Sequence, residues 1–267
     1  KSDGAALAKI QGNWTVSVTD TSAAIATNLD ALQALQAGGH LSGIAQSGTV
    51  APLSITALQA NTDSAALAKI SGSWTANITD SSANIATNLD ILQGLQTGGH
   101  LGTITQSGTA VPLAITALQA KNDGAALAKI QGNWTVNVTD SSSNIASNLD
   151  VLQALKTGGH LGSISQSGTV APLAISAQQA NADAGALNSI TGSWSVSISD
   201  SSANIATNLD AIQALGGKVT TITQSGTAAP LSITALQANA DSAALAKIQG
   251  NWTVSVTDTS AAIATNL

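Results

Sequence analysis

The chain has 267 residues, of which 43% are hydrophobic and 8% charged, and its formal net charge is −6. It contains no Cys, which excludes disulfides, thiolate zinc sites and thiol nucleophiles. It also contains no Arg, only eight Lys, and no apolar run near the roughly 20 residues that span a bilayer, so we expect neither a nucleic-acid partner nor membrane insertion.

A 60-residue repeat organises the sequence. Trp recurs at intervals of 60, 60, 60 and 58 residues, and residues 61–120 match residues 121–180 at 42 of 60 positions. Self-similarity at a fixed period is typical of arrays in which each repeat packs against its neighbours. The predicted repeats are residues 1–60, 61–120, 121–180 and 181–238, the last with a two-residue deletion, followed by residues 239–267 as the start of a fifth, cut within a predicted helix.

The two ends of the chain carry the same sequence. Residues 5–29 and 243–267 are identical. The interpretation that we favour is a window cut from a longer array, because arrays normally close with atypical capping repeats. The alternative is that the identical ends join copies of the chain head to tail.

Residues 61–120 illustrate the elements that we expect in every repeat. Asp63 is a predicted N-cap for a short helix that Gly72 ends, and alternating residues 74–79 predict a half-buried strand. Asp80 then opens a second helix, with an apolar stripe at Ile85, Leu89, Leu92 and Leu95 and a left-handed stop at Gly98-Gly99. Two strands follow, at residues 102–106 and 113–116, and residues 117–120 begin the return helix.

Each repeat therefore has the predicted order β-α-β-β-α. Strand–helix–strand connections of this length favour parallel, right-handed crossovers. The short connection Ser107–Val111 is compatible with an antiparallel hairpin or with a tight arc between stacked strands. The predicted fold is an α/β repeat that forms an elongated solenoid, with a strand face and a helix face.

Carboxylates that recur in each repeat are the first candidates for a binding site. Asp63, Asp80 and Asp90 are weak calcium candidates, because calcium binds six to eight oxygens that usually come from closely spaced carboxylates. Their neighbours in the sequence are Ser, Ala, Asn and Leu, and neither an EF-hand loop nor the glycine-rich calcium nonapeptide is present. We therefore expect helix capping by Asp63 and Asp80 and no metal site.

A Gly-Gly-His sequence ends the predicted second helix in three repeats. His40, His100 and His160 suggest a ladder of metal ligands, but Lys218 replaces them in the fourth repeat. A protonated amine does not ligate metal, so we expect a structural role for a basic residue near the helix C-terminus. No repeat combines a nucleophile, a base and an orienting acid, so we expect no enzymatic activity, no catalytic residue and no cofactor.

Two further patterns suggest surfaces that could bind ligands. The recurring tryptophans could stack on sugars or bases, although their position favours filling space beneath the helices. They are Trp14, Trp74, Trp134, Trp194 and Trp252. Thr-Ile-Thr and Ser-Ile-Ser at 103–105, 163–165 and 221–223 would align hydroxyls on one face, as an ice-binding surface does, but the first repeat has Gly43-Ile44-Ala45.

Three segments resemble long "beta-strand repeat" proteins of proteobacteria. They are the sequence from Trp14 to Leu32 and the later segments Ile-Thr-Gln-Ser-Gly-Thr and Pro-Leu-Ser-Ile-Thr-Ala-Leu-Gln-Ala. The resemblance covers the whole chain and implies a large secreted or surface protein, of a kind described as adhesins or exported by type I secretion. Some of those proteins carry calcium-binding RTX tails, whose nonapeptide is absent here. Near-identical repeats also fit deliberate design.

We therefore expect a structural repeat segment of a bacterial extracellular filament, stalk or adhesin shaft, located outside the cell or on its surface. Its expected partners are other copies of itself, joined end to end or laterally, and surface or glycan contacts would be made by domains outside this sequence. The alternative is a ligand-binding array on a secreted protein, for calcium, glycan or ice.

Overall fold

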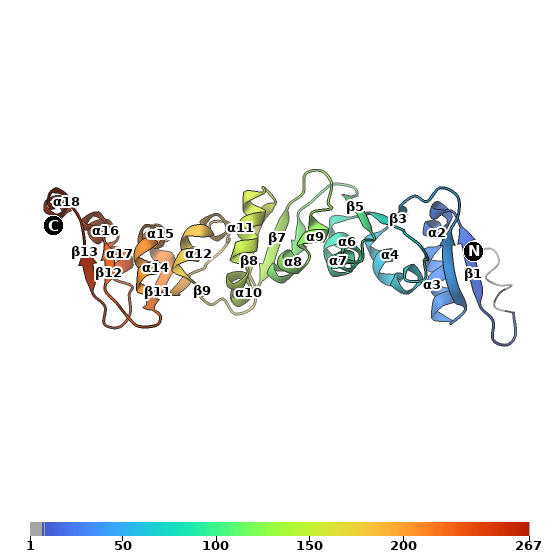
Figure 1. The fold of residues 1–267 in the computed structure, drawn as a ribbon, viewed down its shortest axis with the longest axis horizontal. Helices are drawn as coiled ribbons and strands as arrows, with labels where there is room; N and C mark the ends of the chain where they lie inside the picture. The colour runs from blue at the N-terminus through green and yellow to red at the C-terminus, as the bar shows by residue number, and fades with distance from the viewer. Residues whose placement is uncertain (1–6, 8, 267) are drawn as a thin grey trace. The chain divides into compact units, whose positions relative to one another are not determined.

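The computed structural model describes residue 7 and residues 9–266. Two compact units are present. The first takes the chain up to Ile115 together with Gln119–Trp134, and the second comprises Thr116–Leu118 and the chain from Thr135 onward. Both consist of short strands that alternate with short helices in a repeating order (Figure 1).

The strands follow the predicted pattern of one strand before the long helical segment and two after it. Their bounds are β1 (Val16–Asp20), β2 (Leu41–Gln46), β3 (Leu53–Ile55), β4 (Ala76–Asp80), β5 (Leu101–Gln106), β6 (Leu113–Ile115), β7 (Val136–Asp140), β8 (Leu161–Gln166), β9 (Leu173–Ile175), β10 (Val196–Asp200), β11 (Val219–Gln224), β12 (Leu231–Ile233) and β13 (Val254–Val256).

From α2 to α17 the helices come in pairs, so that each of these predicted helical segments consists of two pieces. Their bounds are α2 (Ser22–Thr27), α3 (Leu29–Ala37), α4 (Ala57–Thr62), α5 (Ser64–Leu67), α6 (Ser82–Thr87), α7 (Leu89–Thr97), α8 (Ala117–Asn122), α9 (Gly124–Leu127), α10 (Ser142–Ser147), α11 (Leu149–Thr157), α12 (Ala177–Ala182), α13 (Ala184–Leu187), α14 (Ser202–Thr207), α15 (Leu209–Ala214), the 3-10 helix η1 (Gly216–Lys218), α16 (Ala235–Ala240), α17 (Ser242–Leu245) and α18 (Ser260–Asn266). The predicted order β-α-β-β-α is confirmed, with each α divided.

Parallel pairing joins strands from successive repeats. In the first compact unit, β4 lies between β3 and β5, and Ile78 is aligned with Ile55 on one side and Ile104 on the other. In the second, β10 lies in the same way between β9 and β11. Because β3 precedes residue 61 and β4 follows it, this sheet combines strands of two predicted repeats, as does the sheet of β9, β10 and β11. The prediction of parallel crossovers is confirmed.

The connection from β5 to β6 is an arc between strands and does not form a hairpin. In the first compact unit, β5 pairs with β4 and makes an isolated parallel bridge from Ile104 to Ile130. The buried hydroxyl of Ser82 fixes the position of the arc. It accepts hydrogen bonds from Gln106 Nε2 at 2.7 Å and from Val111 N at 3.3 Å. The same Gln–Ser–backbone contacts recur around Ser22, Ser142 and Ser202.

The predicted second helix is interrupted at Asn88. α6 ends one residue before it and α7 begins one residue after it, with Asn88 at φ −107° and ψ 17°. The buried Asn88 side chain donates to the Asn84 carbonyl oxygen at 2.8 Å and accepts from Asn61 Nδ2 at 2.8 Å. Expecting one continuous helix was wrong, because the side chain of Asn88 binds the backbone of the preceding turn.

The core lies between the strands and the helices, as the apolar patterns predict. Ile85, Leu89 and Leu92 are 0% exposed, whereas Leu95, the fourth residue of the predicted stripe, is half-buried. The left-handed stop is confirmed at Gly99, whose φ is +74°. In the fourth repeat, the two-residue deletion shortens the second helical piece, since α15 ends at Ala214 and η1 follows directly.

Candidate functional site

A stacked Trp–His pair occupies the end of the helical segment in the first two repeats. Trp74 lies just before β4, and His100 follows the Gly98-Gly99 stop of α7. Their ring centroids are 4.1 Å apart with an interplanar angle of 8°, and His100 Nδ1 lies 3.0 Å from the Trp74 carbonyl oxygen. Trp14 and His40 form the same stack at 3.9 Å and 1°. Since a carbonyl oxygen only accepts, Nδ1 of each of these histidines carries the proton.

The fourth repeat explains why a histidine can be replaced by a lysine at this position. Lys218 Nζ lies over the Trp194 ring, 4.9 Å from its centroid. Both residue types therefore cover a Trp face, the imidazole by stacking and the ammonium by a cation–π contact. The predicted structural role agrees with this geometry, although contact with Trp accounts for the residue better than the helix dipole that we had expected.

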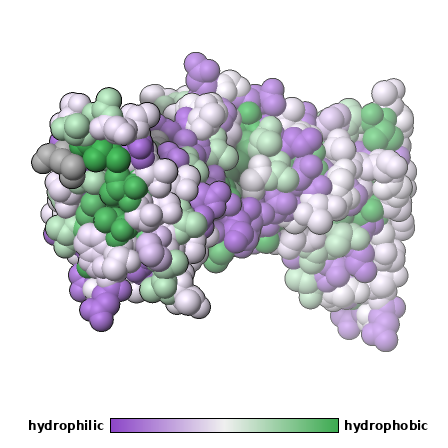
Figure 2. Space-filling model, turned by 60° about the vertical axis from the view of Figure 1, so that its left-hand side comes forward, coloured by the Kyte–Doolittle hydropathy of each residue, from purple (hydrophilic) through white to green (hydrophobic). Residues whose placement is uncertain are grey.

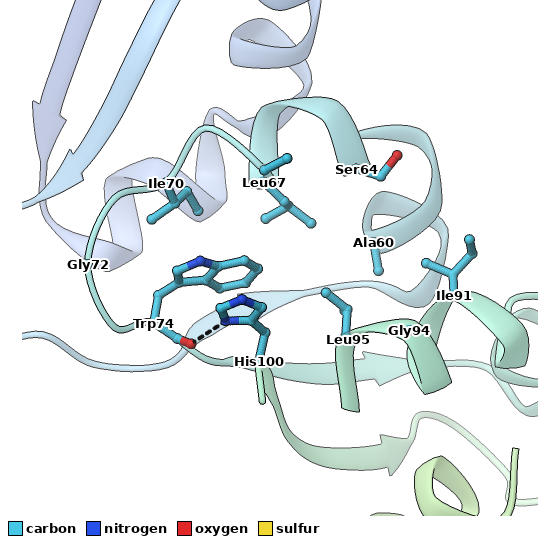
Figure 3. A pocket seen from close by; sticks show the side chains of 11 residues that line it. Ala60, Ser64, Leu67, Ile70, Gly72, Trp74, Ile91, Gly94, Leu95 and His100 are labelled. Carbon is cyan, nitrogen blue, oxygen red and sulfur yellow. Dashed lines mark hydrogen bonds between the residues drawn. The ribbon is translucent and has the colours of Figure 1, made fainter. Parts of the chain in front are cut away.

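A cavity of about 480 Å³ lies beside the Trp74–His100 stack. Figure 3 shows the two rings on one side and apolar side chains of α4, α5 and α7 around the rest. Gly94 leaves space here, since a Cβ added to it would meet nothing within 4 Å. Ser64 lies across the cavity from His100 with its hydroxyl pointing away (Figure 3), so the two do not form a nucleophile–base pair. The site offers apolar contact and no catalytic arrangement.

Asp80 bridges two helix starts. Its Oδ1 accepts from Ser81 N and from Asn84 Nδ2, both at 2.8 Å, and its Oδ2 accepts from Leu58 N, near the start of α4, at 3.4 Å. The N-cap of α6 is Ser81, whose Oγ accepts from Asn84 N at 3.2 Å. The predicted N-cap was therefore one residue too early. Asp80 instead connects α6 to α4, and its two oxygens already have N–H partners.

Asp63 lies between α4 and α5, and its side chain makes no capping hydrogen bond, so its predicted capping role is wrong. The side chain is 3% exposed. Burial, followed by the hydrogen bond and charge of Asp30, raises the pKa of Asp63 above its ordinary value. An ionised carboxylate is costly in such a place, because it is desolvated and faces a second carboxyl group.

Asp90 belongs to the same kind of pair in the next repeat. Burial and the carboxyl group of Asp90 raise the pKa of Asp123 to about 7. The structure thus separates the three calcium candidates, with Asp63 against Asp30, Asp90 against Asp123, and Asp80 between two helices. Among the residues that the structure describes, no three His, Cys, Asp or Glu side chains come together as a metal site.

Hydroxyl and amide side chains line the outward positions of the strands. In the second compact unit, Ser197 is aligned with Thr221 and Ser199 with Thr223. A shallow depression of about 570 Å³ lies on this face, between these residues and Ser176. The predicted row of hydroxyls is therefore present on β10 and β11, whereas β2 carries Gly43 and Ala45 at the aligned positions.

Sequence reasoning missed the polar contacts that connect residues 24 to 33 positions apart. Gln106 with Ser82, Asn61 with Asn88 and Asp63 with Asp30 are the examples in the first compact unit. The sequence shows that Gln, Ser, Asn and Asp recur at the same positions of successive repeats. It does not show which of these side chains contact one another.

Comparison with known proteins provides no family assignment. No model of a protein family matches the chain, and no curated protein matches it. No described helix is long and apolar enough to cross a membrane.

Proposed function

We propose that the chain is a structural repeat segment of an extracellular shaft, such as a bacterial filament, stalk or adhesin stem. The observation that carries the proposal is the recurrence of one set of contacts in successive repeats. The Gln–Ser contact that fixes the arc occurs in four successive repeats at 2.7–2.8 Å. We assign no catalytic activity to the chain.

The proposed architecture is a solenoid in which the repeats continue to stack in one direction. Parallel strand pairing within each compact unit supports it, because a parallel strand can accept another repeat on its free edge without a change of direction. A shaft of this kind gains length from repetition and stiffness from the shared strands. The resemblance to secreted beta-strand repeat proteins supports an extracellular location.

Self-association of the purified 267-residue chain is proposed through the edge of β13. Val254 and Val256 of β13 are 41% and 42% exposed, whereas Val136 and Val138, at the same positions of β7, are 0% and 1% exposed. β13 pairs only with β12 among the described strands. Figure 2 shows hydrophobic residues gathered at the end of the chain that carries β13. An unpaired strand edge next to apolar surface favours addition of another strand.

The test compares Val254→Lys with Val50→Lys. Val50 is the matched control, because it is 54% exposed and lies in the arc between β2 and β3, outside any strand. Light scattering of the purified chain at increasing concentration should show a rising mass, lost in Val254→Lys and kept in Val50→Lys. Equal loss in both variants, or a monomer at every concentration of the unaltered chain, would argue against association through β13.

A further inference from the structure

The helical segments contain four pairs of aspartates, and each pair joins one predicted repeat to the next. In every pair a buried Asp, which lies between two helical pieces, faces an exposed Asp near the start of the preceding long helix. The buried members are 3–5% exposed. The pairs are Asp63 with Asp30, Asp123 with Asp90, Asp183 with Asp150, and Asp241 with Asp210.

Hydrogen bonds on both sides of the first pair fix its position. Gln59 Nε2 of α4 donates to Asp30 Oδ1 at 3.1 Å, and Ala66 N of α5 donates to Gln33 Oε1 of α3 at 2.8 Å. Asp63 lies between these two contacts in the chain, so its carboxyl group is held against α3. The Gln–Ala contact recurs at 2.8 Å beside the other three pairs, at Ala126, Ala186 and Ala244.

The buried carboxyl groups contain oxygen atoms that lack a donor. Oδ2 of Asp63, Asp123 and Asp241 is fully buried and accepts no hydrogen bond from the described residues. The charged groups that act on the four buried aspartates are their partner aspartates, and no lysine is among them. A buried carboxylate without a donor and beside a second carboxylate is unfavourable, but a neutral acid can use one oxygen as an O–H donor to its partner.

We infer that each pair is a proton-binding site, in which the buried Asp is the neutral acid and the exposed Asp is the carboxylate beside it. In the pairs of Asp63, Asp123 and Asp241, this carboxylate accepts the hydrogen bond of the neutral acid. A bound proton joins the junction of α4 and α5 to α3, or the equivalent elements elsewhere in the chain, and its loss places two negative charges in the same contact. Lowering the pH should therefore stabilise the packing of successive helical layers, and raising the pH should destabilise it. This inference does not depend on whether the chain self-associates.

A proton fits these pairs better than a metal cation. Calcium takes six to eight oxygens, and magnesium takes six in near-octahedral geometry. Each pair provides two carboxyl groups, and no third acidic or histidine side chain joins them among the described residues. The neighbouring Gln33 oxygen is already occupied by Ala66 N.

The sign of the pH dependence follows from burial and the facing carboxylate. Together they raise the pKa of Asp123 to about 7 and that of Asp241 to about 6, from 3.8, and they shift Asp63 and Asp183 in the same direction. A raised pKa in the folded state contributes stability that is fully present below the unfolded pKa and is lost as pH rises through the folded pKa. The window is therefore about pH 4 to pH 7.

The test is urea unfolding of the full chain at several pH values from 4 to 8. Each pair that unfolds together with the rest of its compact unit should raise the unfolding equilibrium constant by up to about tenfold per pH unit across this window. The fourfold variant Asp63→Asn, Asp123→Asn, Asp183→Asn and Asp241→Asn should show a flattened dependence and should exceed the unaltered chain in stability at pH 8. The control is Asp20→Asn, which changes an exposed Asp outside the pairs and should keep the original slope.

Three outcomes would overturn the inference. The first is an unchanged slope in the fourfold variant. The second is a stabilisation at pH 7.5 by calcium, relative to EDTA, that the fourfold variant loses, since this would identify a cation site. The third is a carboxyl ¹³C NMR titration of the unaltered chain in which every Asp titrates near pH 4. That titration also decides the question if the fourfold variant does not fold, because Asp123 should titrate well above the exposed aspartates.

Discussion

Removing the side chain at the helix break should reveal what the hydrogen bond between Asn61 and Asn88 contributes. Asn88 and Asn148 occupy equivalent positions, and each is 4% exposed. Both donate from Nδ2 to the carbonyl oxygen four residues earlier, at 2.8 Å and 2.7 Å. Asn88 Oδ1 also accepts from Asn61 Nδ2, whereas Asn148 Oδ1 is buried without a partner among the described residues. The chain thus contains its own matched control.

The expected costs differ by about 2 kcal/mol. Asn88→Ala loses two hydrogen bonds, at about 1 kcal/mol each. Asn148→Ala loses one such bond but also removes a buried acceptor without a partner, a group that costs about 1–3 kcal/mol, so its net effect should lie near zero. A difference of 2 kcal/mol corresponds to about a thirtyfold difference in an equilibrium constant.

Hydrogen exchange of the backbone amides provides the assay, because it reports the opening of each helix separately. Protection of α6 and α7 in Asn88→Ala should fall about thirtyfold, and protection of α10 and α11 in Asn148→Ala should change little. Equal losses in the two variants would refute the reasoning, since they would show that the hydrogen bond from Asn61 contributes nothing.

Substitutions at three further positions test the arc, the Trp–His stack and the cavity beside it. Ser82→Ala removes the acceptor of Gln106 Nε2 and Val111 N, so it should cost about 1–3 kcal/mol and increase proteolysis of the 107–112 arc, with little cleavage of the other arcs. His100→Ala should lose about 0.5–1.5 kcal/mol of stacking in thermal unfolding, whereas His100→Lys should keep most of it, as Lys218 does in the fourth repeat. Gly94→Ala should stabilise α7 by about 0.5–1 kcal/mol in urea unfolding, because its methyl group enters open space; destabilisation would show that the cavity is already filled.

Local patterns predicted the positions of most elements. Alternation around residue 78 located β4 to within two residues of each end, and the Ile85-Leu89-Leu92 stripe identified the buried helix face. The same stripe concealed the helix break, because an apolar period continues across Asn88 while the side chain of Asn88 binds the backbone. The break therefore depends on one polar residue that a hydrophobic pattern does not register.

Contacts between distant residues were beyond prediction from one sequence. The choice between hairpin and arc depends on Ser82, which lies 24 residues before Gln106 and 29 before Val111. Asp63 has the sequence context of an N-cap, but the preceding piece α4 places its side chain against Asp30. Intrinsic propensity indicates which local roles a residue can adopt, such as an N-cap. The packing of residues that are distant in the sequence determines which of these roles it has in the fold.

Electron microscopy of the purified 267-residue chain is the most direct test of the proposed shaft. We expect rod-like particles of constant width whose lengths increase with protein concentration, as copies join through their strand edges. Compact single particles of one size at every concentration would contradict it.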